Sequence, residues 1–312
     1  MHVRHFLSIH DLPQGAFWRL LDLSRHVKAA PVAYAYALKG RALAMIFEKP
    51  SLRTRVTFEI GIQQLGGFAV YLGPQEIGLG KREAVIDVAR NLSRWVHGIM
   101  ARTFEHNTVV ELARYATAPV INGLTDQLHP CQAMADYLTM LEHKGRLMGL
   151  RIAYVGDGNN VAHSLMFGAA QSGARLVVAT PHGYEPDRRI VQMAREDART
   201  SGAIIEVTDD PRAAVTGADV VYTDTWVSMG RESEAAVRRE AFAAYQVNAR
   251  LMSYARPDAI FMHCLPCHRG DEVTDEVIES SQSVVYDQAE NRLHVQKAIM
   301  IDLMHQPGAD CA

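Results

Sequence analysis

The sequence is poor in the features that mark several large classes of protein. It has four cysteines in 312 residues, too few for a disulfide framework, and its longest apolar runs, such as Ala42–Phe47, are far too short to span a bilayer. Lys and Arg number 32 against 35 Asp and Glu, so no basic field attracts nucleic acid or an anionic membrane surface. The first residues lack the apolar stretch and cleavage site of a signal peptide. We therefore expect a cytoplasmic protein that binds neither nucleic acid nor membrane.

Short apolar runs alternate with longer amphipathic stretches along the whole chain. This alternation is typical of βαβ units, and continuously apolar strands suit parallel sheets that are covered on both faces. We expect an α/β fold of two domains, each a mostly parallel β-sheet flanked by helices. The predicted strands are Ala42–Phe47, Ala69–Leu72, Gly98–Ala101, Pro119–Asn122, Arg151–Val155, Leu176–Thr180, Ile204–Val207, Asp219–Tyr222, Ile260–His263 and Val284–Tyr286. The helices predicted between them are Val56–Leu65, Glu83–Trp95, Val109–Tyr115, Gln132–Lys144, Ala162–Gln171, Ile190–Ser201 and Glu232–Tyr245.

A break near His143-Lys144-Gly145-Arg146 indicates the domain boundary, because a helical pattern ends there in a glycine before a new strand begins. We assign residues 1–145 to a first domain and 146–286 to a second. The last helix, at about 287–306, is expected to pack back on the first domain.

The first stretch with chemical potential is Phe47 through Arg55, which follows a predicted strand and opens a predicted helix. A helix N-terminus offers unpaired N–H groups to an anion, the hydroxyls of Ser51 and Thr54 add donors, and the Arg53 and Arg55 guanidinium groups match a phosphate. It is not a Walker A loop. The alternative is an ordinary helix capped by Ser51 with solvated arginines.

Two further strand ends in the same half carry polar groups. His129 and Gln132 lie just before and within the start of a helix, and Arg102 follows another strand. In parallel sheets ligands bind at this edge, and a His donor with a Gln amide suits a carbonyl and its developing oxyanion. The alternative is a polar cap with a satisfied histidine.

In the second half, a predicted strand is followed by the stretch Thr223-Asp224-Thr225-Trp226-Val227-Ser228-Met229-Gly230. This stretch could hold an amino group and a carboxylate, or it could form a simple turn. Upstream, Gly156-Asp157-Gly158-Asn159-Asn160 invites a dinucleotide interpretation. Val161 stands where that fingerprint needs a small residue, and the next strand ends without an acid, which argues against it. We expect no cofactor.

The last such stretch contains a literal C-x-x-C-H and reads His263-Cys264-Leu265-Pro266-Cys267-His268-Arg269-Gly270. That pattern is found at c-type haem attachment sites, and a redox pair or a metal site is also conceivable. The α/β context and the missing export signal argue against haem. The favoured interpretation is a loop at a strand end that places Cys264 in a cleft, with no metal.

These stretches, in this order and spacing over nearly the whole chain, resemble the ornithine carbamoyltransferases. Three smaller matches are Gly156 through Asn160, Tyr184-Glu185-Pro186-Asp187 and Ala289-Glu290-Asn291-Arg292. The resemblance implies transfer of the carbamoyl group of carbamoyl phosphate to L-ornithine. It also implies two α/β domains that bind one substrate each and are joined by interdomain helices, and a homotrimer or a multiple of trimers. It also implies that a polar residue near Gln75-Glu76 of a neighbouring chain touches the phosphate.

The resemblance also implies roles for individual residues. Arg102, His129, Cys264 and Arg292 would be catalytic. Carbamoyl phosphate would be bound by Ser51, Leu52, Arg53, Thr54, Arg102, His129 and Gln132, and ornithine by Asn160, Asp224, Ser228, Met229, Cys264 and Leu265. We expect Cys264 and the Leu265 carbonyl to orient the amine, and Cys264 not to act as a nucleophile.

Three residues depart from the family pattern. Leu52 stands where many relatives have Thr, Arg231 where Gln is usual, and Cys267 where Ala is common. The alternatives are the related aspartate, putrescine and N-acetylornithine carbamoyltransferases and a non-catalytic binding protein of the same fold. Aspartate carbamoyltransferases lack the Asp-x3-Ser-Met-Gly and His-Cys-Leu-Pro patterns, putrescine needs no carboxylate clamp, and an acetylated amine would not need Asp224.

Overall fold

The computed structural model describes residues 4–305 except 229 and 231. The chain divides into two compact units, residues 1–135 with 292–312 and residues 136–291. The division falls inside two helices, α6 (Pro130–Lys144) and α13 (Val285–Met304), so each of them contributes residues to both units.

The first unit contains a parallel sheet of four strands in the order β2-β1-β3-β4. The inner strand β1 is buried at every position, which explains its uninterrupted apolar sequence. The strands are β1 Ala42–Phe47, β2 Phe68–Leu72, β3 Gly98–Arg102 and β4 Val120–Leu124.

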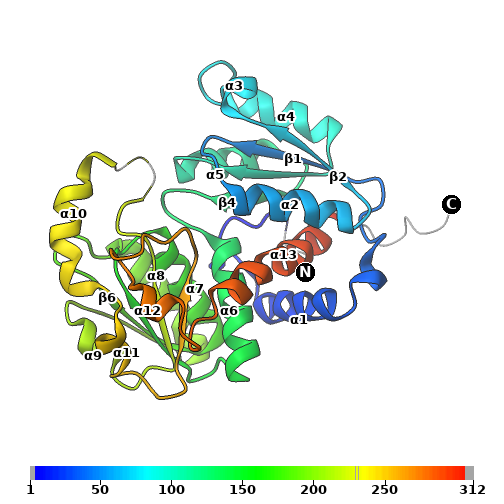
Figure 1. Ribbon diagram of the computed structural model, residues 1–312. Coiled ribbons are helices and arrows are strands. Elements are labelled where there is room, and N and C mark those ends of the chain that lie inside the picture. The colour runs from blue at the N-terminus through cyan, green and yellow to red at the C-terminus, as the bar shows by residue number, and fades with distance from the viewer. Residues whose placement is uncertain (1–3, 229, 231, 306–312) are drawn as a thin grey trace. The chain divides into compact units, whose positions relative to one another are not determined.

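Helices cover both faces of this sheet (Figure 1). One face packs against α4 (Val85–Trp95) and α5 (His106–Tyr115), whose apolar residues share a core with β1 and β3. On the other face, a Cβ at Gly98 would lie 2.8 Å from the sulfur of Met304, so the end of α13 lies directly against β3. Helix α2 (Leu52–Gln64) also packs against α13.

Helix α1 (Ala16–Ala29) was not predicted, although its buried residues follow helical spacing. They are Ala16, Phe17, Leu20, Leu21, Ser24 and Val27. It lies alongside α13, where Arg19 and Asp302 form an ion pair of 3.5 Å (Figure 1).

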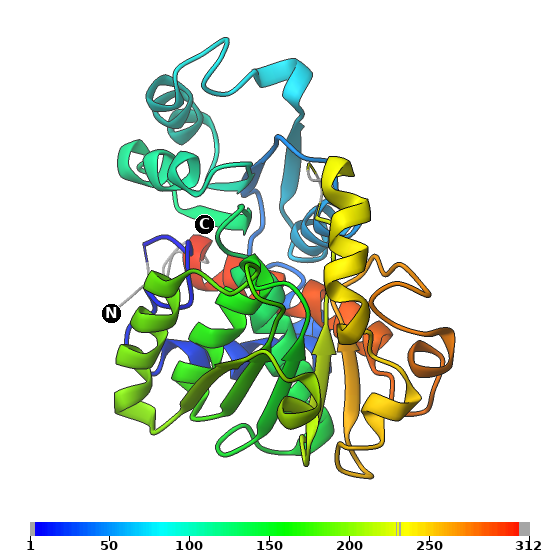
Figure 2. The same cartoon turned by 90° about the vertical axis from the view of Figure 1, so that its left-hand side faces the viewer.

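The second unit contains a parallel sheet of five strands in the order β7-β6-β5-β8-β9. Figure 2 shows these strands side by side, coloured green to orange. Their bounds are β5 Arg151–Val155, β6 Arg175–Ala179, β7 Ile204–Thr208, β8 Val220–Thr223 and β9 Ile260–His263.

On one side of this unit, α6 and α7 (Asn160–Ser172) approach closely, because Gly168 leaves room for the ring of Tyr137. A Cβ at Gly168 would lie 2.0 Å from that ring, and the Tyr137 hydroxyl donates to the Leu165 carbonyl at 2.7 Å. Helix α8 (Arg188–Ser201) packs beside α7. A second core, around Trp226 and Phe242, includes residues of the remaining helices of this unit. These helices are α9 Pro211–Val215, α10 Ala235–Phe242, α11 Ala249–Met252 and α12 Asp275–Ile278.

Two sequence-based expectations differ from the structure. The predicted strand Val284–Tyr286 is wrong, because Val285 already begins α13 and only a single bridge joins Ser283 to Phe261. An apolar run of three residues cannot distinguish a strand from the first turn of a buried helix. The stretch Glu232–Tyr245 is helical but interrupted, as η2 (Glu232–Glu234), α10 and η3 (Ala243–Tyr245). Within the described residues, no helix has the length and apolar character needed to cross a membrane.

Each sheet has one place where the strand order reverses. In the first sheet β1 has β2 on one side and β3 on the other, and in the second β5 has β6 on one side and β8 on the other. The loops that leave the carboxyl ends of such strands diverge, and ligands of parallel sheets bind in the crevice between them. The residues 48–51 and 103–105 of the first unit, and 156–159 and 224–228 of the second, are therefore the places to look for a site.

Candidate active site

The loop after β1 ends in a capped helix. Ser51 is the N-cap of α2, and its hydroxyl accepts the Thr54 N–H at 3.3 Å. The capping alternative is therefore confirmed for Ser51. The other N–H groups of the first turn have no partner within the helix, as at any helix N-terminus, and suit an anion. Leu52, in this turn, is 74% exposed. Its apolar side chain has no donor, so it can offer an anion only its backbone N–H.

Two arginines from distant parts of the chain meet at one hydroxyl. Thr54 is fully buried, and its Oγ1 accepts from Arg292 Nη2 at 2.8 Å and from Arg102 Nη1 at 3.4 Å. Arg102 ends β3 and Arg292 lies in α13, and both side chains are buried. Such a concentration of buried positive charge suits a doubly charged anion, because two guanidinium groups can each donate to phosphate oxygens.

His129 lies in the same cationic surroundings. It precedes α6 directly, and its carbonyl accepts from the N–H of Gln132 at 3.2 Å. Burial, together with Arg292, Arg102 and Arg53, holds the pKa of His129 well below its usual value. The imidazole is therefore neutral at pH 7, and as a neutral ring it can donate one hydrogen bond to a carbonyl oxygen without carrying charge.

Gln132 and Lys49 complete this half. Gln132 is buried in the first turn of α6. Lys49 was part of the predicted stretch but was given no role. Its ammonium lies 4.4 Å from the centre of the Phe104 ring, and burial and the nearby Arg102 lower its pKa. The structure thus brings Arg102, Thr54, His129 and Arg292 together.

In the second unit, Asn159 joins the two diverging loops. Its Oδ1 caps α7 by accepting the Val161 N–H at 2.9 Å, and its Nδ2 donates to Asp224 Oδ2 at 2.8 Å. Asn159 therefore fixes the orientation of the Asp224 carboxylate. The prediction named Asn160 and not Asn159, although both belong to the same motif, because sequence spacing does not show which of two adjacent amides turns back to cap the helix.

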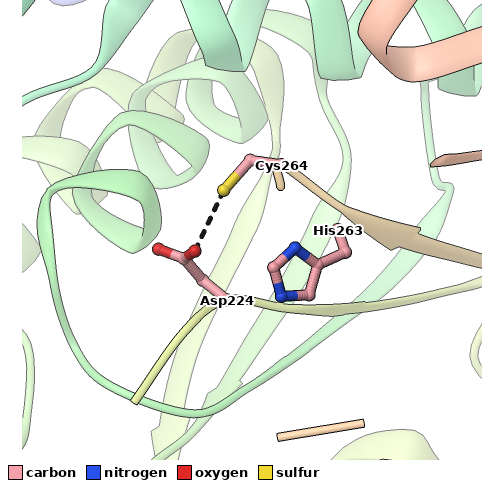
Figure 3. Close-up of side chains that lie close together, drawn as sticks. All are labelled: Asp224, His263 and Cys264. Atoms are coloured by element: carbon pink, nitrogen blue, oxygen red, sulfur yellow. Dashed lines mark hydrogen bonds between the residues drawn. The ribbon is translucent and has the colours of Figure 1, made fainter. Parts of the chain in front are cut away.

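Figure 3 shows Cys264 beside Asp224, with His263 next to them. The Cys264 thiol donates to Asp224 Oδ1 at 3.0 Å. His263 is fully buried. Its Nδ1 accepts the Leu265 N–H at 2.8 Å, so Nε2 carries the proton and faces Glu272 Oε1 at 3.2 Å. The buried Glu272 thereby fixes the histidine, and the histidine fixes the turn that carries Cys264 and Leu265.

Asp224, His263 and Cys264 place possible metal-ligand atoms within 4.8 Å of one another. Both ring nitrogens of His263 are already engaged, however, by Leu265 and Glu272. Only a carboxylate and a thiol remain, and a tetrahedral zinc site needs three or four protein ligands. Asp224 and Cys264 alone do not make such a site.

Other predicted residues have less structural context. Asn160 opens α7 next to Asn159, and Ser228 lies partly exposed in the loop after β8. Met229 and Arg231 lie outside the described residues. Cys267 is a free, partly buried thiol whose pKa is raised by burial and by Glu272. A low pKa marks reactive thiols, so the C-x-x-C pattern gains no support from this environment.

The chain matches two family models that together cover most of its length. Residues 4–142 match the model described as aspartate/ornithine carbamoyltransferase, carbamoyl-P binding domain, and residues 148–303 match the one described as aspartate/ornithine carbamoyltransferase, Asp/Orn binding domain.

Curated relatives agree with these matches. The chain is 60% identical over 267 residues to a protein from Thermococcus kodakarensis named ornithine carbamoyltransferase, covering 86% of this chain and 85% of the relative. It is 52% identical over 303 residues to one from Pyrococcus furiosus named ornithine carbamoyltransferase, anabolic, with 96% of each covered. A solved structure titled ornithine carbamoyltransferase from Pyrococcus furiosus matches with a TM-score of 0.94 at 52% identity, covering 96% of this chain and 97% of that one.

Proposed function

The chain belongs to the aspartate/ornithine carbamoyltransferase family, and on that premise we propose that it transfers the carbamoyl group of carbamoyl phosphate to the δ-amine of L-ornithine, giving L-citrulline and phosphate. The observation that carries the proposal is the buried cluster of Arg102, Arg292 and Thr54 beside a neutral His129. It combines a site for a phosphate dianion with a donor for a carbonyl oxygen, which are the two recognisable parts of carbamoyl phosphate.

Carbamoyl phosphate binds to the first unit in this proposal. Phosphate oxygens accept from the N–H groups of the first turn of α2, from the Ser51 and Thr54 hydroxyls and from Arg53. Arg102 reaches both phosphate and carbonyl oxygens, and His129 and Gln132 hold the carbamoyl group. The Leu52 side chain points to solvent, so its departure from the family pattern costs one hydroxyl contact but leaves its N–H in place.

Ornithine binds to the second unit. Its α-ammonium pairs with Asp224, and Asn160, Ser228 and the backbone of Met229 hold the α-carboxylate. Asp224 already accepts from Asn159, the Thr225 N–H and Cys264, which orients it but leaves lone pairs for the ammonium. A positive α-ammonium favours this carboxylate and an acetylated amine does not, so N-acetylornithine is the weaker candidate.

The transfer needs a neutral amine. With a pKa near that of Lys, about 10.4, only about 1 in 2,500 δ-amines is neutral at pH 7, a cost of about 4.6 kcal/mol. In the step itself a C–N bond forms to the carbamoyl carbon, the C–O bond to phosphate breaks, and the amine proton passes to the leaving phosphate. Arg102, Arg292 and His129 stabilise the negative charge that grows on the oxygens.

Cys264 orients the amine in this proposal and forms no covalent intermediate. Its thiol donates to Asp224, which this proposal assigns to the α-ammonium, and the His263–Glu272 pair fixes the turn that carries it. The Leu265 carbonyl provides a second acceptor for the amine protons.

We place the reaction in arginine biosynthesis, which accords with the word anabolic in the name of the Pyrococcus furiosus relative. We also propose a cytoplasmic location, because none of the three described cysteines, Cys131, Cys264 and Cys267, forms a disulfide, which suits a reducing compartment.

We propose a homotrimer or a multiple of trimers, and an exposed apolar surface on the first unit supports self-association. Leu52, Val56 and Ile60 are exposed four residues apart on α2, and Phe68 and Val70 are exposed on the edge strand β2. Gln75 and Glu76 are exposed on α3 (Pro74–Ile77), where they could reach the phosphate site of a neighbouring chain. Light scattering on the purified protein measures the assembly directly.

The activity is tested by mixing the protein with carbamoyl phosphate and ornithine and measuring citrulline and phosphate together. Equal amounts of the two products are expected. Phosphate without citrulline would mean that the protein only hydrolyses carbamoyl phosphate and would overturn the proposal.

A further inference from the structure

Arg238, on α10, is a buried cation that no part of the proposed chemistry uses. Its side chain is 2% exposed. Its Nη1 donates to Asp157 Oδ2 and to the Trp226 carbonyl, both at 2.9 Å, and its Nε donates to Glu234 Oε2 at 2.8 Å. The guanidinium also lies 4.9 Å from the centre of the Tyr184 ring. One side chain therefore joins three separate segments of the second unit.

Two of those segments carry the residues assigned to ornithine. Asp157 lies in the loop after β5, and its carbonyl accepts the N–H of Asn159 at 2.8 Å. Trp226 lies in the loop after β8, two residues beyond Asp224 and two before Ser228. A single nitrogen, Arg238 Nη1, bonds to both loops, so it fixes the distance between them.

Arg238 itself is anchored firmly. Phe242, one turn further along α10, stacks on Trp226 with ring centres 5.8 Å apart, and it contacts Tyr184 at 4.8 Å. Charge adds to this packing, because Asp157 and Glu234 both pair with the guanidinium. Asp157 is nearly buried, and a buried carboxylate is strongly destabilised when its paired cation is removed. Asp157 therefore depends on Arg238.

We propose that Arg238 is a positioning residue that sets the affinity for the α-amino and α-carboxylate groups of the amino-acid substrate. It acts by holding the Asp157–Asn160 loop and the Asp224–Ser228 loop at the spacing at which both groups are bound at once. It does not touch the reacting atoms. The inference rests on the proposed function, because it takes the substrate of these loops to be an α-amino acid.

The test compares Arg238→Met with Arg239→Met. Methionine keeps the apolar stem and removes every donor. Arg239, the next residue on α10, is exposed and pairs with Asp271 at 2.9 Å. The KM values of ornithine and carbamoyl phosphate are measured together with the inhibition constant of L-norvaline. Norvaline has the α-groups of ornithine but no δ-amine, so it reports on these loops alone.

For Arg238→Met, we expect the ornithine KM and the norvaline inhibition constant to rise together by tenfold or more. The KM of carbamoyl phosphate and the values for Arg239→Met should stay within about twofold of the wild type. A merely structural role would lower kcat by reducing the active fraction and would leave the KM and the inhibition constant unchanged, which would overturn the inference.

Asp157→Asn tests the same link with little change in volume and serves if Arg238→Met does not fold. It should raise both the KM of ornithine and the inhibition constant of norvaline at least threefold. If both values equalled those of the wild type, the inference would be overturned. A wild-type protein that makes no citrulline would instead overturn the proposed function, so the two failures are distinguishable.

Discussion

Replacing Gly158 by alanine should damage ornithine binding through the backbone. A Cβ at this position would lie 2.2 Å from the Pro186 nitrogen, 2.5 Å from the Glu185 carbonyl carbon and 2.6 Å from Pro186 Cδ. An ordinary contact is at least 3.4 Å, so the segments must separate by about 1.2 Å. No side-chain rotation can relieve this contact, because the nearest atoms belong to the backbone and a proline ring.

The displaced loop is the one that carries Asn159 and Asn160. A misplacement of about 1 Å can cost about 10²-fold in rate, and overpacking typically costs about 1–3 kcal/mol of stability. For Gly158→Ala we expect kcat/KM for ornithine to fall by about 10²-fold, with the KM for carbamoyl phosphate nearly unchanged. Steady-state kinetics with each substrate varied in turn measures both values.

Gly61→Ala is the matched control. Its Cβ would lie 3.2 Å from the terminal methyl of Met300, a flexible side chain that can move. Its ornithine kinetics should equal those of the wild type. If Gly158→Ala also kept wild-type kinetics for ornithine, the assignment of this loop to the amino acid would be wrong.

Three further predictions follow from the same geometry. Arg102→Ala should lower kcat/KM by about 10²-fold or more in steady-state assays, because it removes a donor to developing negative charge. Retained activity would show that the phosphate does not bind at this arginine. The depressed pKa of His129 means that below about pH 6.5 the unfolded chain binds a proton that the folded chain does not, so stability falls with falling pH by up to about 1.4 kcal/mol per pH unit. In urea unfolding, the free energy of unfolding of His129→Gln should fall less on acidification than that of the wild type. An equal fall in both proteins would mean that His129 is protonated in the folded state. Intact-mass spectra of the protein with carbamoyl phosphate should show no adduct, and a carbamoyl group on Cys264 would contradict its orienting role.

The inner strands of the parallel sheets were predictable because they are buried on both faces. The apolar runs that became β1, β3, β5 and β8 are continuous, and this pattern identifies them without any knowledge of their neighbours. The short run Val284–Tyr286 was misassigned for the opposite reason, since three apolar residues satisfy a helix and a strand equally well.

Three residues at the anion cluster, Thr54, Arg102 and His129, could be predicted because they follow strand ends, and parallel strands end at the same edge of a sheet. Arg292 lies within α13 and was named only through the resemblance to the family. Arg238 could not be predicted, because it lies in the middle of a helix and meets Asp157 across 81 positions of sequence. Its role depends on a packing of α10 against the loop after β8 that no local pattern encodes.

The central claim is that the first unit takes carbamoyl phosphate and the second takes ornithine. It is tested most directly by measuring carbamoylation of ornithine, putrescine, N-acetylornithine and aspartate side by side at saturating carbamoyl phosphate. The account predicts a kcat/KM for ornithine far above the other three, because only ornithine offers an α-ammonium to Asp224, a free α-carboxylate and a δ-amine. A higher value for any other acceptor would contradict it.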